Sequence, residues 1–274
     1  MRTLSLNLNK QLLSITLFLM IALCYSYSYS QDSLKDKVIL AVFAHPDDEG
    51  TVSPILARYL REGVKVHLVI VTDGRYGTND HTDHESGEEL VFMRKEEMKC
   101  AASKLGVELI HLDYHDQLRA NEGFDGHVPH ARSLIKELYD IVTEIKPDVI
   151  ITWGPDGSSN HMDHRLVGAS MTQIVVNKVW DNSISLYYYG RPSDHLDSAE
   201  SKILRGQDKR YLTTRISYTD EDIEKAYNSI MCHKSQIRPT TLEAYKARKT
   251  KNGAAVYLRK FIAPPTKITY SIFE

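Results

Sequence analysis

The sequence predicts an α/β fold in which a mostly parallel sheet is covered by helices on both faces. From Lys37 onward, short runs rich in β-branched and apolar residues alternate with longer stretches of helical composition, an order typical of βαβ units. The first run, residues 37–43 (KVILAVF), is almost continuously apolar, as a strand buried on both faces requires. No linker, repeat or low-complexity tract follows residue 30, so residues 31–274 are expected to form one domain.

The first crossover helix is marked by its end signals. Ser53 and Pro54 suit the N-cap and the first helical position, and the helical pattern then continues to Arg61. Gly63 follows as a helix stop. The next apolar run, residues 65–72 (KVHLVIVT), predicts a second strand.

Two further helix and strand pairs follow along the chain. A helix is expected over residues 88–105, because their composition is helical and Gly106 can terminate it. A third strand is expected over residues 107–112. An amphipathic helix over residues 130–145 then leads to a fourth strand at residues 148–153.

The rest of the chain is patterned less regularly. Asn160 can cap a helix that continues to Val179, and residues 184–189 (ISLYYY) predict a fifth strand. Beyond Gly190 the pattern weakens. It still predicts helices over residues 220–231 and 242–248 and a possible last strand over residues 267–273.

Charge and cysteine content exclude two classes of protein. The chain has 274 residues, 34 Lys and Arg against 36 Asp and Glu, and a formal net charge of −2. This balance provides no basic surface for a phosphate backbone, so nucleic acid is not an expected partner. Beyond Cys24, only Cys100 and Cys232 remain, too few for a disulfide framework or a cysteine-based zinc site. Whether these two cysteines pair is left open.

Residues 1–30 are expected to be a secretory signal peptide. Arg2 and Lys10 precede the charge-free, mostly apolar run 12–24 (LLSITLFLMIALC), which is shorter than the about 20 residues that a spanning helix needs. Ser28 and Ser30 are small residues at the positions a signal peptidase recognises. Cleavage would leave a periplasmic or secreted protein without a stable membrane span. An uncleaved N-terminal anchor is the alternative.

The first chemically dense loop follows the first strand. In a parallel α/β sheet, ligands bind beyond the carboxyl ends of the strands. The first strand runs into Ala44–Glu49 (AHPDDE), which places His45 beside the paired carboxylates of Asp47 and Asp48. Pro46 favours an extended backbone at His45. Complementing the positive end of the following helix would explain the acids, but it would not explain the histidine.

A second such loop follows the fourth strand. His161, Asp163 and His164 (HMDH) stand where a helix is expected to begin, and the two histidines, three apart, can share one of its faces. Together the two loops offer His and Asp ligands of the kind that Zn2+ accepts, with a position left for water. An uncoordinated carboxylate could deprotonate that water, and a second histidine could stabilise an oxyanion. Fe2+ suits the same ligands.

His81 and His84 repeat the His-x-Asp-His spacing in the loop after the second strand. They lie within a long polar loop, and no strand-to-helix turn sets their geometry. We therefore interpret them as residues that line a substrate cleft, and a second metal site is the weaker alternative.

The two motifs, in this order, resemble those of the PIG-L or LmbE-like deacetylases, zinc hydrolases that remove acetyl or related acyl groups from N-acylated sugars. The resemblance implies a Rossmann-like fold, and it extends along most of the chain after residue 30. Further similar elements are Thr72-Asp73-Gly74, Arg94–Glu97, Leu105-Gly106, Asp113, Lys225 and His233–Gln236 (HKSQ). Ser158-Ser159-Asn160 stands where some members place a tyrosine, so assistance from a tyrosine is not expected.

The resemblance also implies a role for individual residues. His45, Asp48 and His164 would bind zinc, and Asp47 would be the general base. His161 would stabilise the oxyanion or act as general acid, and Asp163 would orient His161. Arg94 would contact the sugar. From the residue types alone, Asp47 and Asp48 are equally suited to be the metal ligand.

The resemblance therefore leads to the prediction of a zinc-dependent hydrolase that deacetylates an N-acetylglucosamine-type sugar or its conjugate. Its partner would be a small molecule or glycan that carries an acetamido sugar. Two alternatives remain: a catalytically inactive metal- or carbohydrate-binding module, and an amidase that cuts a thiol–sugar conjugate. The oligomeric state is not predicted.

Overall fold

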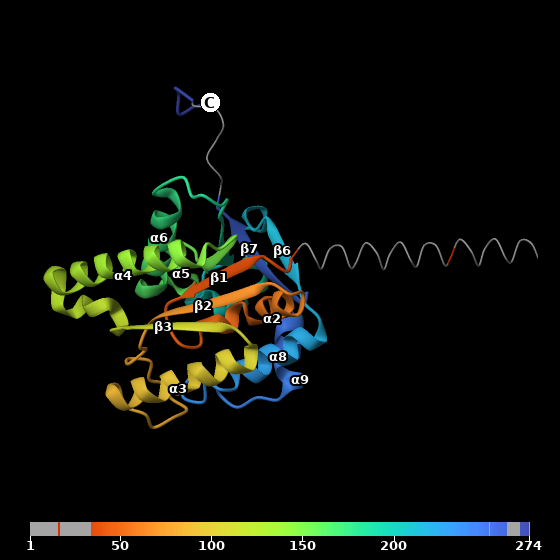
Figure 1. The fold of residues 1–274 in the computed structure, drawn as a ribbon. Helices are drawn as coiled ribbons and strands as arrows, with labels where there is room; N and C mark the ends of the chain where they lie inside the picture. The colour runs from red at the N-terminus through yellow and green to blue at the C-terminus, as the bar shows by residue number, and fades with distance from the viewer. Residues whose placement is uncertain (1–15, 17–33, 252, 262–268, 274) are drawn as a thin grey trace, which may run out of the picture.

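A seven-stranded mixed sheet organises the protein (Figure 1). The computed structural model describes residues 34–251, 253–261 and 269–273, together with residue 16. The strand order is β3-β2-β1-β4-β5-β7-β6. The first five of these strands are parallel, and β7 is antiparallel to both β5 and β6. The strands are β1 (Val38–Phe43), β2 (Lys65–Thr72), β3 (Glu108–Tyr114), β4 (Val149–Trp153), β5 (Ser185–Gly190), β6 (Thr214–Ser217) and β7 (Ala255–Lys260).

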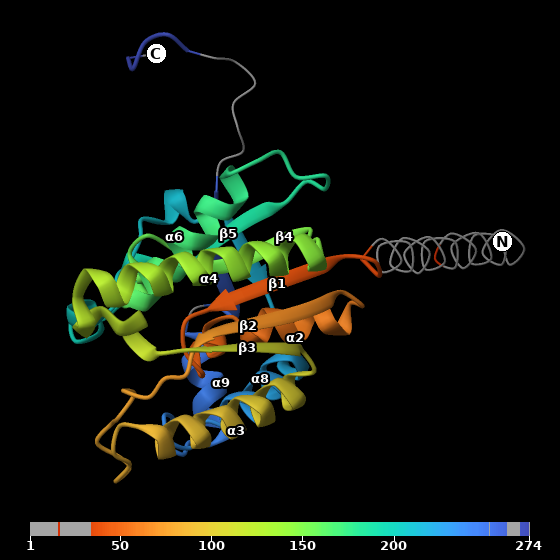
Figure 2. The same cartoon turned by 60° about the vertical axis from the view of Figure 1, so that its left-hand side comes forward.

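Helices cover both faces of the sheet, as the sequence predicts. In Figures 1 and 2, α2, α3 and α8 lie on one face, and α4 and α6 lie on the other. The α-helices are α2 (Ser53–Arg61), α3 (Glu88–Leu105), α4 (Gly123–Ile145), α5 (Gly157–Asn160), α6 (Met162–Val176), α7 (Glu200–Ile203), α8 (Asp220–Ile230) and α9 (Leu242–Thr250). Short 3-10 segments are η1 (Asp48–Thr51), η2 (Asp116–Glu122), η3 (Ser193–His195) and η4 (Lys209–Tyr211).

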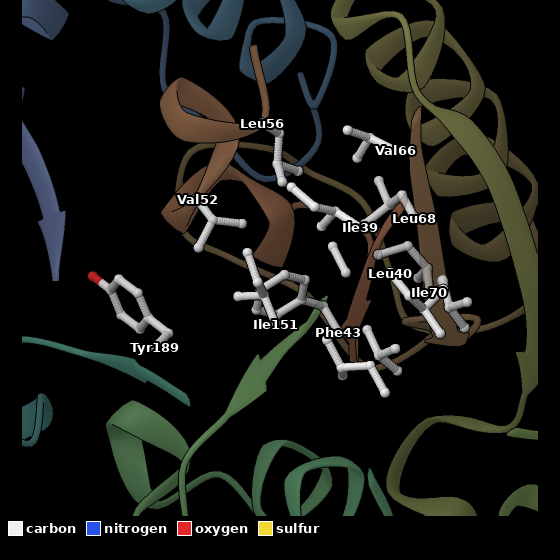
Figure 3. Close-up of a cluster of buried hydrophobic side chains, with 14 of the residues drawn as sticks. Ile39, Leu40, Phe43, Val52, Leu56, Val66, Leu68, Ile70, Ile151 and Tyr189 are labelled. Carbon is white, nitrogen blue, oxygen red and sulfur yellow. The ribbon is translucent and has the colours of Figure 1, made fainter. Parts of the chain in front are cut away.

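The core lies along the central strands. Leu40 and Phe43 of β1 are fully buried, as are Leu68 and Ile70 of β2. Figure 3 shows these side chains gathered with Leu56 of α2 and Ile151 of β4. Each large apolar side chain that is fully buried contributes roughly 1.5–3 kcal/mol. The strands that carry the two motifs therefore belong to the most strongly packed part of the molecule.

The predicted strands and helices up to residue 190 are confirmed with small shifts at their ends. The largest difference is at α4, which begins at Gly123 rather than His130 and contains Pro129. Gly123, Gly126 and Pro129 all disfavour a helix interior, so local sequence signals place the start too late. β3 extends to Tyr114 rather than ending at Leu112.

Two predicted caps are wrong by one residue. The N-cap of α6 is His161, whose Nδ1 accepts a hydrogen bond from the backbone N–H of Asp163, and Asn160 lies before it with a positive φ of 60°. α6 ends at Val176 rather than Val179. The N-cap of α2 is Val52, because the preceding η1 turn leads directly into the helix.

The C-terminal part contains two strands that the sequence pattern did not predict, β6 and β7. They extend the parallel sheet with an antiparallel ribbon. The predicted strand at 267–273 begins outside the described residues, and residues 269–273 form no strand. The predicted signal peptide also lies outside the described residues, apart from residue 16. Among the described helices, none has the length and apolar character needed to cross a bilayer.

A disulfide joins Cys100 on α3 to Cys232, just beyond α8, across a sequence separation of 132 residues. The sequence left open whether these two cysteines pair, and the structure shows that they do. Ser229 adds a second tie between the same helices, because its hydroxyl donates to the carbonyl oxygen of Ala101 at 2.9 Å.

Candidate active site

The two motifs meet at the carboxyl ends of β1 and β4. These strands are neighbours in the sheet, but β1 leads to α2 on one face and β4 leads to α6 on the other. The connections therefore diverge and leave a crevice at this edge, the usual place for a ligand in a doubly wound sheet. A cavity of about 210 Å³ opens here. It is lined by His45, Asp47, Tyr76, Gly77, Arg94, Asp116, Gln117, His161 and Gln236.

A larger cavity of about 860 Å³ lies elsewhere, between α6, β5 and β7. Its lining is mostly apolar and contains no His, Asp, Glu or Cys. The smaller cavity therefore holds the groups that can carry out chemistry.

His45, Asp48 and His164 converge beside this smaller cavity. Nδ1 of His45 lies 3.1 Å from Nε2 of His164 and 3.4 Å from Oδ2 of Asp48. Oδ1 of Asp48 lies 3.2 Å from Nε2 of His164. Ligand atoms of a tetrahedral zinc ion, each about 2.0–2.1 Å from the metal, lie about 3.3 Å apart. The separations among these three side chains fit a metal ion.

Hydrogen bonds outside this trio orient the two histidines. Nδ1 of His164 donates to the carbonyl oxygen of Gly157 at 2.8 Å, which leaves the lone pair of Nε2 directed at Asp48 and His45. The ring of His164 stacks on Trp153, with centroids 4.3 Å apart and planes within 6°. Nε2 of His45 faces the carboxylate of Asp163 at 3.1 Å. Such partners commonly set the tautomer of metal-binding histidines.

Two other sets of side chains also bring possible metal ligands together, and both include His45. One consists of His45, His161 and His164, and the other of His45, Asp116 and Asp163, with ligand atoms within 4.8 Å of one another in each. In the second set the contacts of His45 are made by Nε2, on the opposite side of the ring from Asp48 and His164. The carboxylates of that set also accept backbone N–H groups, as Asp48 does.

The charges of this cluster stabilise one another. Burial alone would lower the pKa of His45, but its hydrogen bonds to Asp116, Asp163 and Asp48 raise the pKa well above the ordinary value. Burial alone would raise the pKa of Asp48, but His164 and His45 hold it well below the ordinary value. Asp48 is therefore ionised at neutral pH, as a metal ligand must be.

Asp47 differs from Asp48 in both contacts and environment. Asp48 Oδ2 accepts the backbone N–H groups of Ala44 and His45, at 3.1 and 2.8 Å, whereas Asp47 lines the cavity. Burial, opposed by the charge of Arg94, raises the pKa of Asp47 to about 6. The structure thus separates the two neighbouring carboxylates: one faces the histidines and the other remains available to accept a proton near neutral pH.

Arg94 lines the cavity, but its guanidinium is mainly engaged with the protein. Nη1 donates to the carbonyl oxygen of Gly74 at 2.8 Å, and Nη2 donates to the carbonyl oxygen of Pro46. Nη2 also lies 3.5 Å from Oδ1 of Asp47. The side chain is 3 % exposed. Its observed contacts therefore join the two loops that border the cavity.

The carboxylate of Asp163 does not contact the ring of His161 in the way that the family resemblance implies. It faces Nε2 of His45 and accepts the N–H of Gln117 at 2.9 Å. The contact between Asp163 and His161 runs through the backbone N–H of Asp163, 3.3 Å from Nδ1 of His161. Burial and the charges of His45 and His164 lower the pKa of half-buried His161.

Asp116 belongs to the cavity, and sequence reasoning missed it. The acid singled out after the third strand, Asp113, instead forms an ion pair with Lys95 at 2.8 Å. Because β3 extends to Tyr114, the acid that reaches the cavity comes later in the chain. Asp116 Oδ1 lies 3.3 Å from Nε2 of His45. Tyr76, Gln117 and Gln236 also line the cavity without having been singled out individually.

The sequence led us to expect His81 and His84 in the lining of the substrate cleft, and it left His233 without an assigned role. Within the described chain, neither His81 nor His84 lines the cavity or joins a cluster of possible metal ligands. His233 is fully buried and pairs with Glu49, with Nε2 and Oε1 2.7 Å apart. Burial would lower the pKa of His233, but the charge of Glu49 and its hydrogen bond raise it.

Comparisons with known proteins identify relatives that are named as deacetylases. One relative is the 1D-myo-inositol 2-acetamido-2-deoxy-alpha-D-glucopyranoside deacetylase of Corynebacterium glutamicum (strain R), 30% identical over 148 residues, which are 49% of this chain and 51% of the relative. The protein of the same name from Mycobacterium sp. (strain JLS) is 24% identical over 255 residues, 83% of this chain and 80% of the relative. The chain thus matches about half the length of the first of these relatives.

A solved structure shares the fold. The N,N'-diacetylchitobiose deacetylase of Pyrococcus horikoshii superposes with a TM-score of 0.62 at 21% identity, covering 82% of this chain and 84% of that one. The family model described as PIG-L, GlcNAc-PI de-N-acetylase, matches residues 40–175, from β1 into α6. Both motifs of the candidate site lie within this stretch. Over residues 40–175 the chain is therefore similar to the PIG-L family.

Proposed function

We propose that the protein is a metal-dependent N-deacetylase that acts on an N-acetylglucosamine-type sugar or its conjugate. The observation that carries the proposal is the position of Asp47, a carboxylate outside the His45–Asp48–His164 trio that lines the same cavity. The match to the PIG-L family model and the activity of the relatives, which are named as deacetylases of an acetamido sugar, support the reaction and the class of sugar.

His45, Asp48 and His164 would hold the metal, through the atoms whose separations fit a tetrahedral ion. Zinc is the metal we propose, and Fe2+ suits the same ligands. When bound, such an ion acts as a Lewis acid and lowers the pKa of a water ligand toward about 7. Asp163 and Asp116 would hold Nε2–H of His45, so that Nδ1 is the coordinating atom.

Asp47 would accept the proton of the attacking water. A general base works best when its pKa lies close to the operating pH, and burial raises the pKa of Asp47 to about 6. Arg94 would keep the carboxylate in place, since it lies 3.5 Å away and is itself fixed by two backbone carbonyls.

His161 would stabilise the oxyanion, and the proton that Asp47 takes from the water would pass to the leaving amine. Nδ1 of His161 accepts the N–H of Asp163, which places the ring proton of the neutral form on Nε2. The lowered pKa keeps the ring neutral near pH 7. Because His161 lines the cavity, this N–H is a suitable donor to a developing negative charge.

The sugar would bind through its hydroxyl groups. Tyr76, Gln117 and Gln236 provide uncharged polar groups around the cavity, and such groups fix the orientation of a small polar ligand. A neutral acetamido sugar, free or as part of a conjugate, matches this lining.

We also propose that the protein is exported after cleavage of residues 1–30. The N-terminal pattern supports this, and so does the Cys100–Cys232 disulfide, since such bonds persist mainly in oxidising compartments. Expression of the full chain followed by cell fractionation and N-terminal sequencing would test it. Retention of Met1 in a cytoplasmic product would contradict the proposal.

Metal analysis combined with an acetate-release assay tests the proposed reaction. The purified protein, loaded with zinc or with iron(II), is incubated with N-acetylglucosamine, N,N'-diacetylchitobiose and an inositol-linked N-acetylglucosamine. We expect about one metal ion per chain, as a three-ligand site holds, and release of acetate with appearance of a free amine. Bound metal without turnover of any acetamido sugar would instead indicate a binding module.

A further inference from the structure

The segment that carries His233, far along the chain from the two motifs, contacts the loop of the first motif. His233 lies beyond the stretch that the family model matches. Its Nε2 nevertheless lies 2.7 Å from Oε1 of Glu49, which follows the two aspartates of the first motif. Both side chains are fully buried. An ion pair without access to water is costly unless both partners are well bonded, so this contact requires an explanation.

The second oxygen of Glu49 holds the backbone of Asp47. Oε2 accepts the N–H of Asp47 at 3.0 Å. Asp47 has a φ of 103° and a ψ of −20°, in the left-handed region. A residue with a side chain is strained in such a conformation and retains it only where the surroundings enforce it. A continuous chain of bonds therefore runs from His233 through Glu49 to the backbone of Asp47.

We propose that His233 and Glu49 are positioning residues that hold Asp47 in the strained conformation which directs its carboxylate into the cavity. The proposal rests on the function proposed above, in which Asp47 is the base. Neither His233 nor Glu49 lines the cavity, so they would act only through Asp47.

The segment that carries His233 is anchored independently of Glu49. Cys232 is bonded to Cys100 of α3. Ser235 donates its N–H and its hydroxyl to the carboxylate of Glu97, each at 2.7 Å. With these anchors on α3, His233 can serve as a fixed support for the motif loop. Removal of its imidazole should therefore loosen the loop while the segment stays in place.

The contact also explains why Glu49 follows the two aspartates. A carboxylate buried without a cation would shift its pKa or destabilise the fold. With His233 opposite, Glu49 can accept both the imidazole N–H and the backbone N–H of Asp47. His233 therefore provides the buried carboxylate of Glu49 with a hydrogen-bond donor.

The test compares His233→Ala, His233→Gln and a matched control, Ser229→Ala, in the zinc-loaded protein. Ser229 is equally buried and ties α8 to α3, but it does not contact Glu49. We expect His233→Ala to lower kcat about 10–100-fold, the range seen when a supporting partner is removed. KM and zinc content should stay near the wild-type values. His233→Gln, whose amide can still donate to Glu49, should recover most of kcat, and Ser229→Ala should keep the wild-type kcat.

Hydrogen exchange of the Asp47 amide, measured by NMR, gives a readout that does not depend on turnover. We expect faster exchange in His233→Ala than in the wild type, and wild-type exchange in Ser229→Ala. Unchanged exchange in His233→Ala would overturn the positioning role, as would a loss of kcat that the glutamine variant fails to recover. A wild-type protein that releases no acetate would refute the proposed function, and the exchange experiment would still decide whether His233 supports Asp47.

Discussion

Nδ1 of His45 lies 3.1 Å from Nε2 of His164, although the two residues are 119 positions apart in the chain. Asp48 lies within 3.4 Å of both atoms. The fold thus brings two nitrogen ligands and one oxygen ligand to one point, next to the cavity that holds Asp47 and His161.

The metal assignment can be tested by comparing three variants. We expect His164→Ala to lose bound zinc, because it removes one of three ligands. His161→Ala should retain zinc but lose turnover, because His161 lies outside the proposed coordination set. Asp116→Asn should also retain zinc. Metal content measured after dialysis decides, and loss of zinc in His161→Ala or Asp116→Asn would favour one of the other two ligand sets.

The role of Asp47 makes a second prediction. Asp47→Asn keeps the size of the side chain and removes its capacity to accept a proton. We expect kcat to fall by about 10²–10⁴-fold, the usual contribution of a general base, with zinc content unchanged. Steady-state kinetics and metal analysis on the same preparation provide the comparison. Wild-type turnover with a full complement of zinc would rule out Asp47 as the base.

The packing of α6 on the end of β4 makes a third prediction. A Cβ atom added at Gly168 would overlap the carbonyl oxygen of Trp153, a backbone atom that cannot move easily. Ala usually stabilises a helix relative to Gly by about 1 kcal/mol. We expect the opposite for Gly168→Ala, a loss of about 1–3 kcal/mol in the free energy of unfolding from overpacking. Urea denaturation measures it.

The control for Gly168→Ala is the neighbouring exposed residue. Ala169→Gly should cost up to about 1 kcal/mol, as helix propensity alone predicts. Since α6 also carries His164, Gly168→Ala should weaken zinc binding, whereas Ala169→Gly should not. A stabilising effect of Gly168→Ala would show that the helix does not approach β4 as closely as described.

The disulfide makes a fourth prediction, on stability. Cys100 and Cys232 close a long loop, and such a crosslink typically contributes about 2–4 kcal/mol to the free energy of unfolding. We expect a reductant to lower the Tm of the wild type. A Cys100→Ala/Cys232→Ala double variant should melt near the reduced wild type and should not respond to the reductant. Equal melting of oxidised and reduced wild type would contradict this.

Lys249 makes a fifth prediction, on the pH dependence of stability. Burial and the charges of Arg191 and Arg248 lower the pKa of Lys249 to about 8, while its Nζ donates to the carbonyl oxygen of Gly50 at 3.0 Å. Between about pH 8 and the unfolded-state pKa near 10.4, the unfolded chain binds more protons than the folded chain at this site. Stability contributed by this group therefore rises with pH across that window.

Thermal melts of the wild type and Lys249→Met from pH 7 to 10 provide the measurement. The Tm of the wild type should rise relative to that of the variant as the pH increases through about 8, the folded-state pKa of Lys249. Below that pH both states are protonated, so the difference should be constant. A difference in Tm that is flat over the whole range would show that the ammonium is not destabilised by its surroundings.

Much of the fold could be read from the sequence, because each signal was local. Apolar runs of strand length and helix stops such as Gly63 and Gly106 depend on nearby residues only. The antiparallel pair of β6 and β7 was missed because its pairing joins segments far apart in the chain, where short amphipathic strands give a weak pattern. α4 was predicted too short because Pro129 outweighed the helical context.

The sequence by itself determined that the AHPDDE and HMDH motifs should lie together, because both follow buried strands and the carboxyl ends of parallel strands meet at one edge. Only the tertiary structure distinguished Asp48, bonded to backbone N–H groups and facing His164, from Asp47 in the cavity. Only the tertiary structure, too, placed the carboxylate of Asp163 against His45 and the imidazole of His233 against Glu49. These choices depend on how helices pack across more than a hundred residues of separation, which local patterns do not encode.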